Sequence, residues 1–119
     1  STSAFHEDIK NLPKNIDGIV LPKVEKSEDL RHVTKELEQH NFSQLNIIAG
    51  FETARGVEHV SSILEEAPDQ LKAVYFGAED FIADMGGERT REGLEVLYAR
   101  SKVVLAAKTR GLLALDQVV

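Results

Sequence analysis

The sequence contains no cysteine. A chain without cysteine forms no disulfide and offers no thiolate, which excludes cysteine nucleophiles and cysteine metal sites. No apolar run approaches the ~20 residues that a membrane-spanning helix needs. The N-terminus also lacks the charged-then-apolar pattern of a secretory signal. These absences predict a cytoplasmic protein that makes no membrane contact.

Basic residues are scarce as well. Lysine and arginine number 14 against 20 aspartates and glutamates, which leaves a net charge of −6 and an isoelectric point near 5.2. Aromatic residues make up only 6% of the chain. Nucleic-acid binding needs clustered cations for phosphate contacts, so this balance predicts no nucleic-acid partner. A domain that acts on a small molecule or on a protein partner remains.

The length and composition suit one folded unit. The chain has 119 residues, of which 42% are hydrophobic and 29% are charged, as is ordinary for globular proteins. We therefore expect a single domain over residues 1–119.

Four short apolar runs rich in β-branched or aromatic residues predict strands at residues 16–21, 45–51, 73–76 and 112–119. The first three are nearly continuous in apolar residues, which is typical of parallel strands covered on both faces. Helices are expected over residues 27–40, 57–67 and 90–110, with a further short one in the first ten or so residues. This alternation predicts an α/β fold with about four parallel strands and right-handed crossovers.

The longest expected helix, residues 90–110, has an apolar side made of Leu94, Leu97, Tyr98, Val104 and Leu105. No glycine-rich phosphate loop follows any strand, because neither GxGxxG nor GxxxxGK[ST] occurs in the chain. A nucleotide-binding or redox α/β module therefore loses support.

Acidic residues recur where the expected strands end. Glu25 follows the first strand, Glu52 the second, and Glu79 and Asp80 the third, while Asp116 falls within the last. Strand carboxyl ends line the ligand site in parallel α/β folds. Glu52 and Asp80 are the natural pair for a hard cation, since Mg²⁺ is commonly held by one or two carboxylates with water and substrate oxygens. The alternative is that these acids only cap the following helices and bind nothing.

Several segments, in order along the chain, match the signature blocks of one family: DGIVLPKVEKSEDL, FETARGV, YFGAEDFIADMGGERTREGLEVLYARSKVVLAA and the final ALDQVV. From about residue 16 onwards the chain resembles the citrate lyase β-subunit-like branch of the HpcH/HpaI aldolase superfamily. The resemblance implies a (β/α)₈ barrel that uses Mg²⁺ to make or break a carbon–carbon bond. The implied substrates are 3-hydroxyacyl-CoA thioesters of the citryl-, malyl- or citramalyl-CoA class, cleaved to an acyl-CoA and a 2-oxo acid.

The resemblance also implies roles for single residues. Glu52 of FETARG and Asp80 of GAEDF correspond to the metal ligands of the family. Around them, the expected substrate-binding or loop-organising residues are Lys23 and Glu25 of LPKVE, Arg55 of ETARG, and Glu79 and Asp84 of the third block. The catalytic base stays unidentified.

A complete barrel needs about 250 residues, and this chain supplies four strands that resemble the fourth to seventh of the family barrel. The first three strands and the eighth strand of the family barrel have no counterpart in this chain. The arginine that usually binds the substrate carboxylate and the C-terminal segment of the family have none either. The chain is therefore either part of a full enzyme or a half-barrel that associates with another, and we expect a homo-oligomer in both cases. Its function is either a Mg²⁺-dependent carbon–carbon lyase or a truncated, non-catalytic homologue serving assembly or regulation.

Overall fold

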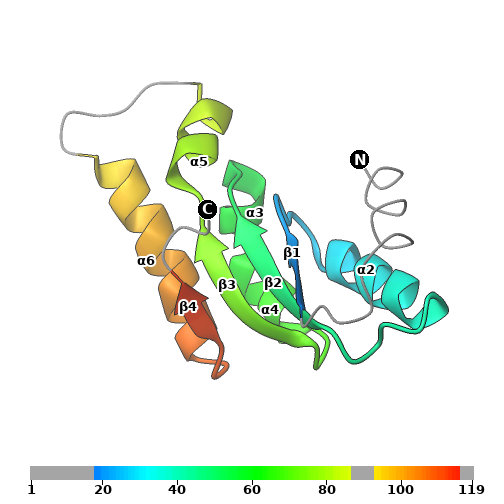
Figure 1. The fold of residues 1–119 in the computed structure, drawn as a ribbon. Coiled ribbons are helices and arrows are strands. Elements are labelled where there is room, and N and C mark those ends of the chain that lie inside the picture. The colour runs from blue at the N-terminus through cyan, green and yellow to red at the C-terminus, as the bar shows by residue number, and fades with distance from the viewer. Residues whose placement is uncertain (1–17, 87–92, 116–119) are drawn as a thin grey trace.

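The computed structural model describes residues 18–86 and 93–115, which form a four-stranded, all-parallel sheet with the strand order β1-β2-β3-β4 (Figure 1). The strands are β1 (Gly18–Leu21), β2 (Asn46–Phe51), β3 (Leu71–Phe76) and β4 (Leu113–Leu115). The helices between them are α2 (Ser27–Gln39), α3 (Ala54–Glu58), α4 (Val60–Glu65), α5 (Ala78–Asp84) and α6 (Leu94–Lys108). The prediction of four parallel strands with alternating helices is confirmed.

The helices cover one face of the sheet. When neighbouring parallel strands follow one another in sequence order, right-handed crossovers place all connecting helices on the same side. Helix α4 packs between α2 and α6 on that side (Figure 1). The core between the sheet and the helices is aliphatic and aromatic, with Ile47, Phe51 and Val74 from the strands and Leu30 and Val103 from the helices all at most 1% exposed.

The opposite face of the sheet is apolar and partly open. Val20 and Leu115 are 40% and 36% exposed, and Leu113 is 62% exposed, whereas Tyr75 on the same face is only 7% exposed. Register pairs Gly50 with Tyr75 and Tyr75 with Leu115, so these residues share that face.

Helix α2 begins where its sequence predicts. Asp29 closes a capping box, because its Oδ2 accepts the backbone N–H of Glu25 at 2.8 Å and that of Lys26 at 3.2 Å. Glu28 adds a second acid to the first turn, which favours the positive end of the helix dipole. Buried Leu30, Val33 and Leu37 form the inward side, as the spacing predicted.

Three expectations about the helices were incomplete or wrong: two concern the segments 57–67 and 78–84, and the third concerns the buried side of α6. The helix expected over 57–67 is two short helices, α3 and α4, which meet at His59, where φ −107° and ψ 12° leave the helical region. Helix α5 was not predicted at all. It is seven residues long and is held by buried Phe81, whose ring lies 5.3 Å from that of Phe76. A helix this short depends on such tertiary packing for its stability.

The predicted apolar side of α6 faces away from the core. Leu94, Leu97, Tyr98 and Leu105 are 59%, 57%, 66% and 67% exposed, and Val104 is 37% exposed. The buried side instead consists of Val96, Ala99, Val103, Ala106 and Ala107. This helix is apolar nearly all round, so spacing alone does not select a side, and the small alanine side chains allow close approach to the sheet and α4.

Some expectations lie outside the described residues: the helix in the first ten or so residues, the ends of the first and last strands and the first turn of the 90–110 helix. Within the described ranges, no helix combines the length and the apolar character required to cross a bilayer.

Candidate metal centre

The candidate centre lies at the carboxyl ends of β2 and β3. Glu52 directly follows β2, and Gly77 directly follows β3 and leads into α5, which carries Asp80 in its first turn. The two strand ends are adjacent, since Phe51 pairs with Phe76 and the Gly77 N–H donates to the Phe51 carbonyl at 3.2 Å. The sheet therefore brings the two predicted metal ligands to one rim.

The Glu52 carboxylate is buried and held by backbone. Its side chain is 7% exposed, and the Lys23 N–H donates to Oε2 at 2.8 Å. Lys23 adopts a left-handed conformation with φ 55°, which L-residues other than glycine seldom occupy. The next N–H, that of Val24, donates to the Gly50 carbonyl at 2.9 Å. The turn after β1 thus aims one N–H at Glu52 and anchors the next on β2.

Gly77 makes room for the same side chain. A Cβ built on Gly77 would stand 2.7 Å from Glu52 Cγ and 2.8 Å from Oε1. These separations are far below van der Waals contact, so only glycine allows Glu52 to lie across this backbone. Lys23 on one side and Gly77 on the other constrain the two carboxylate oxygens.

The two carboxylates interact electrostatically. Burial raises the pKa of Glu52 above its ordinary value, the neighbouring Asp80 carboxylate raises it further, and the Lys23 N–H and the Tyr75 hydroxyl oppose this rise. Two neighbouring negative charges, one of them buried, disfavour simultaneous ionisation of both carboxyl groups. A divalent cation between them would remove that penalty, and carboxylate oxygens are the ligands that Mg²⁺ prefers. Asp80 is exposed, so the pair is accessible from solvent.

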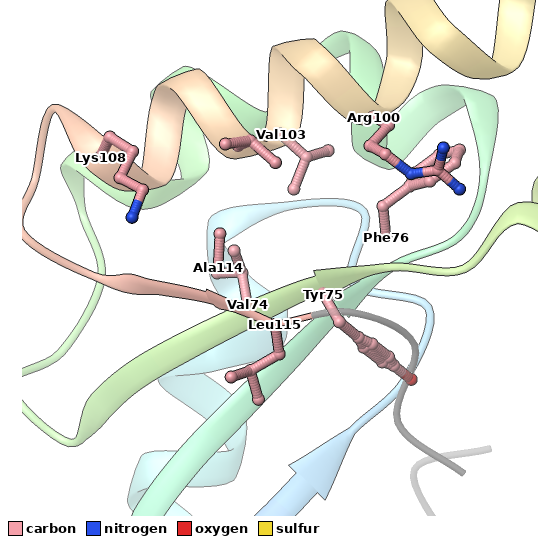
Figure 2. A pocket seen from close by; sticks show the side chains of 9 residues that line it. Val74, Tyr75, Phe76, Arg100, Val103, Lys108, Ala114 and Leu115 are labelled. Atoms are coloured by element: carbon pink, nitrogen blue, oxygen red, sulfur yellow. The ribbon is translucent and has the colours of Figure 1, made fainter.

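Tyr75 is the neighbour that sequence reasoning missed, because its strand position suggested only a core residue. Its hydroxyl group interacts with Glu52, and burial together with the Glu52 and Asp80 charges raises the pKa of Tyr75 to about 12. Figure 2 shows the ring projecting from the face of β3 opposite to Phe76 and Arg100. Only the strand register relates the two residues: Gly50 and Glu52 lie two residues apart on one face, and Tyr75 pairs with Gly50.

The whole chain, residues 1–119, matches the family model described as HpcH/HpaI aldolase/citrate lyase. The chain belongs to this family. It is 46% identical over 115 residues to a citrate lyase subunit beta-like protein of Deinococcus radiodurans, covering 97% of this chain and 39% of that protein. It is 34% identical over 133 residues to human mitochondrial citramalyl-CoA lyase, covering 99% of this chain and 39% of the lyase.

A solved member of the HpcH/HpaI family has the same fold. The citrate lyase beta subunit from M. tuberculosis, complexed with oxaloacetate and magnesium, superposes with a TM-score of 0.68 at 32% identity. The match covers 86% of this chain and 43% of that one. The present chain thus spans about two fifths of the length of these two curated relatives. Its sheet corresponds to part of the barrel of the family.

The five remaining predicted site residues fall into three groups. Asp84 and Glu25 make structural hydrogen bonds. Asp84 Oδ2 accepts the Ala54 N–H at 2.7 Å, which connects α5 to the start of α3. The backbone N–H of Glu25 donates to Asp29 Oδ2 at the start of α2. Glu79 and Arg55 are exposed, and no hydrogen bond or ion pair among the described residues joins them to Glu52 or Asp80. Lys23 contributes its backbone N–H to the centre.

Two carboxylates, those of Glu52 and Asp80, form the candidate set of metal ligands. Over residues 18–86 and 93–115, no group of three or more histidine, aspartate or glutamate side chains is arranged to hold a metal ion. Asp116 lies outside these ranges. Two carboxylates suit Mg²⁺, which usually keeps several waters or substrate oxygens, and do not suit a closed structural zinc site.

A separate cavity of about 510 Å³ lies between α6 and strands β3 and β4 (Figure 2). Val74 and Phe76 of β3 and Val103, Arg100 and Lys108 of α6 line it, and the Arg100 guanidinium lies 5.7 Å from the Phe76 ring centroid. Neither Glu52 nor Asp80 contributes to it. The candidate metal centre therefore lies at the rim of the sheet and not in this cavity.

Proposed function

We propose that this chain carries the metal-binding part of a Mg²⁺-dependent carbon–carbon lyase of the citrate lyase β-like type. The observation that carries the proposal is the pairing of Glu52 and Asp80 at adjacent strand ends, with Glu52 held by the Lys23 N–H at 2.8 Å. The magnesium complex of the related M. tuberculosis subunit supports the same choice of metal.

The proposed substrate is a 3-hydroxyacyl-CoA of the citryl-, malyl- or citramalyl-CoA class, and the products are an acyl-CoA and a 2-oxo acid. Human citramalyl-CoA lyase and the oxaloacetate complex of the M. tuberculosis subunit support this class of chemistry. Cleavage breaks the bond between C2 and C3 of the acyl chain. Its electron pair passes to the thioester enolate while the C3 hydroxyl loses its proton and becomes the carbonyl of the 2-oxo acid. Protonation of the enolate at C2 then gives the acyl-CoA.

Glu52 and Asp80 would hold the metal in this reaction. When bound, Mg²⁺ supplies Lewis acidity toward the carboxylate and carbonyl oxygens of the 2-oxo acid product. The two protein carboxylates leave coordination positions for those oxygens. Gly77 and Lys23 keep the Glu52 carboxylate in place during the reaction. The proton of the substrate hydroxyl needs another acceptor, since both carboxylates are engaged by the metal.

We place this chemistry in one partial barrel domain over residues 1–119. The chain spans 39% of each of the two relatives named above. In the proposed enzyme, further barrel strands therefore supply the groups that bind the rest of the substrate. We also propose that the chain self-associates, and sedimentation velocity at two protein concentrations tests this.

A second candidate is a non-catalytic homologue that serves assembly or regulation. The short span relative to the relatives favours it, as does the presence of only a carboxylate pair among the described residues. Turnover of a 3-hydroxyacyl-CoA by the purified chain would rule it out.

The deciding experiment is a calorimetric Mg²⁺ titration of the chain with and without oxaloacetate. We expect saturable binding that tightens with oxaloacetate, and at least about tenfold weaker binding in Glu52→Gln and Asp80→Asn. Glu38→Gln on α2 and Asp69→Asn before β3 are matched controls, because each makes the same chemical change at an exposed site away from the centre. Equal affinity in all five proteins, or no binding at millimolar Mg²⁺, would contradict the metal-site assignment.

A further inference from the structure

We propose that Tyr75 is a positioning residue for the metal centre: its hydroxyl, held over Gly50, orients the Glu52 carboxylate and thereby sets the affinity for a divalent cation. This inference rests on the proposed function, because it assumes that Glu52 and Asp80 bind the metal. It adds a residue on the sheet face opposite the helices that is not itself a ligand.

The packing of β2 and β3 leads the Tyr75 ring toward Glu52. Tyr75 pairs with Gly50, and Glu52 lies two residues beyond Gly50 on the same face. A Cβ on Gly50 would stand 2.4 Å from Tyr75 Cζ and 2.5 Å from Oη. The ring therefore occupies the space that a side chain at position 50 would need. The Cζ, Oη and Cε1 atoms of Tyr75 lie against the β2 backbone at Gly50, two residues before Glu52.

Three groups then constrain one carboxylate. The Lys23 N–H donates to Oε2 at 2.8 Å, the Gly77 backbone lies beneath Oε1, and the Tyr75 hydroxyl interacts with the same side chain. An ionised carboxylate has about four lone-pair directions. Contacts that occupy some of these directions limit the orientations that the carboxylate can adopt beside Asp80, with which it interacts electrostatically. Partners of this kind orient a ligand, and their loss typically weakens metal binding by about 10- to 100-fold.

The phenol also suits this role chemically. Tyr75 is 7% exposed, so water competes poorly for its hydroxyl, and a phenol hydroxyl can donate a hydrogen bond to a carboxylate. A phenylalanine at position 75 would keep the ring over Gly50 and remove only the hydroxyl. Tyr75→Phe is therefore the variant that separates positioning from packing.

The chain provides its own spectroscopic reporter. It has two tyrosines and no tryptophan, so Tyr98→Phe leaves Tyr75 as the only tyrosine emitter. Tyr98 is 66% exposed on α6, so this substitution is also the matched hydroxyl-removal control. We expect Mg²⁺ to change the emission of Tyr75 saturably in Tyr98→Phe, at the same midpoint that calorimetry gives for the unsubstituted chain.

The test compares Mg²⁺ affinity in the unsubstituted chain, Tyr98→Phe and Tyr75→Phe by calorimetry, with the thermal midpoint of each. We expect the first two to bind equally and Tyr75→Phe to bind about tenfold more weakly, with its thermal midpoint little changed. Equal affinity in Tyr75→Phe, or Tyr75 emission that ignores saturating Mg²⁺, would overturn the positioning role while leaving the metal site intact. Absence of binding in the unsubstituted chain would instead overturn the proposed function, and the positioning role with it.

Discussion

Glu52 lies across the backbone of Gly77, so close that a Cβ on this glycine would stand 2.7 Å from Glu52 Cγ. The contact joins the carboxyl end of β2 to that of β3, and the chain continues from Gly77 directly into the helix that carries Asp80. The backbone at Gly77 therefore constrains the position of Glu52 and also leads into the helix that carries Asp80, the second proposed ligand.

Gly77→Ala should displace Glu52 and weaken Mg²⁺ binding at least about tenfold. Gly77 has φ −99° and ψ 99°, which alanine adopts without strain, so the effect is steric. Overpacking of this kind costs about 1–3 kcal/mol of stability. A double-mutant cycle checks the cause: in a Glu52→Ala background, adding Gly77→Ala should cost much less than it does alone. A full cost in that background would show that the clash involves another group.

Glu52→Gln should raise the free energy of unfolding at neutral pH in the absence of metal. The folded state raises the pKa of Glu52, mainly by burial, so it favours the neutral form, and ionisation costs stability. That cost is absent below the unfolded value of 4.5 and appears as the pH rises through the folded value. The glutamine keeps a carbonyl oxygen for the Lys23 N–H. Urea unfolding of both proteins at several pH values should show a gap that closes on acidification, and a gap that widens toward low pH would contradict this sign.

Tyr75 should ionise with a midpoint near pH 12, followed by phenolate absorbance in the Tyr98→Phe variant. Burial is the main cause, and the charges of Glu52 and Asp80 add to it. Because the folded pKa is raised, stability from this group is complete below pH 10.0 and is lost as the pH rises toward 12. Adding Glu52→Gln should lower the midpoint, since it removes one nearby charge. An unchanged midpoint would mean that Glu52 does not act on the phenol.

Asp84→Ala should destabilise the chain by about 1.5–3 kcal/mol, which is the usual contribution of a hydrogen bond to a charged group. Because Asp84 is exposed, we expect a value at the lower end of this range. Its Oδ2 accepts the Ala54 N–H at 2.7 Å and ties α5 to the residues just after Glu52. Asp69→Ala, at an exposed loop position, is the comparison and should change stability by less than about 0.5 kcal/mol. The urea midpoints of the two variants measure the difference, and similar midpoints would mean that the Asp84 contact contributes nothing.

Leu105→Ala should change stability by less than about 0.5 kcal/mol, because the side chain is 67% exposed. Val103→Ala, two residues earlier on the same helix, should cost about 1–3 kcal/mol, because Val103 is 1% exposed and its loss leaves a cavity. Thermal unfolding of the two variants compares the sides of α6 directly. The reverse order of stabilities would mean that the helix packs on its other side.

The order of the four strands, and the presence of helices between them, was predictable from local pattern, because apolar runs and helical spacing report directly on which segments can be buried. The proximity of Glu52 and Asp80 was predictable for a related reason: residues at or shortly after the carboxyl ends of neighbouring parallel strands lie at one rim. The resemblance to the HpcH/HpaI aldolase/citrate lyase family, which the comparison confirmed, depended on linear motifs alone.

Three features needed the tertiary structure. Helix α5 is too short to be stable alone and depends on the packing of Phe81 against Phe76. The buried side of α6 depends on which of its apolar residues let the helix approach the sheet, and spacing does not contain that information. The contact of Tyr75 with Glu52 depends on strand register, which pairs Tyr75 with Gly50. Local pattern therefore determined which segments fold and which acids meet, whereas packing between segments decided the surroundings of those acids, because these contacts join residues distant in sequence.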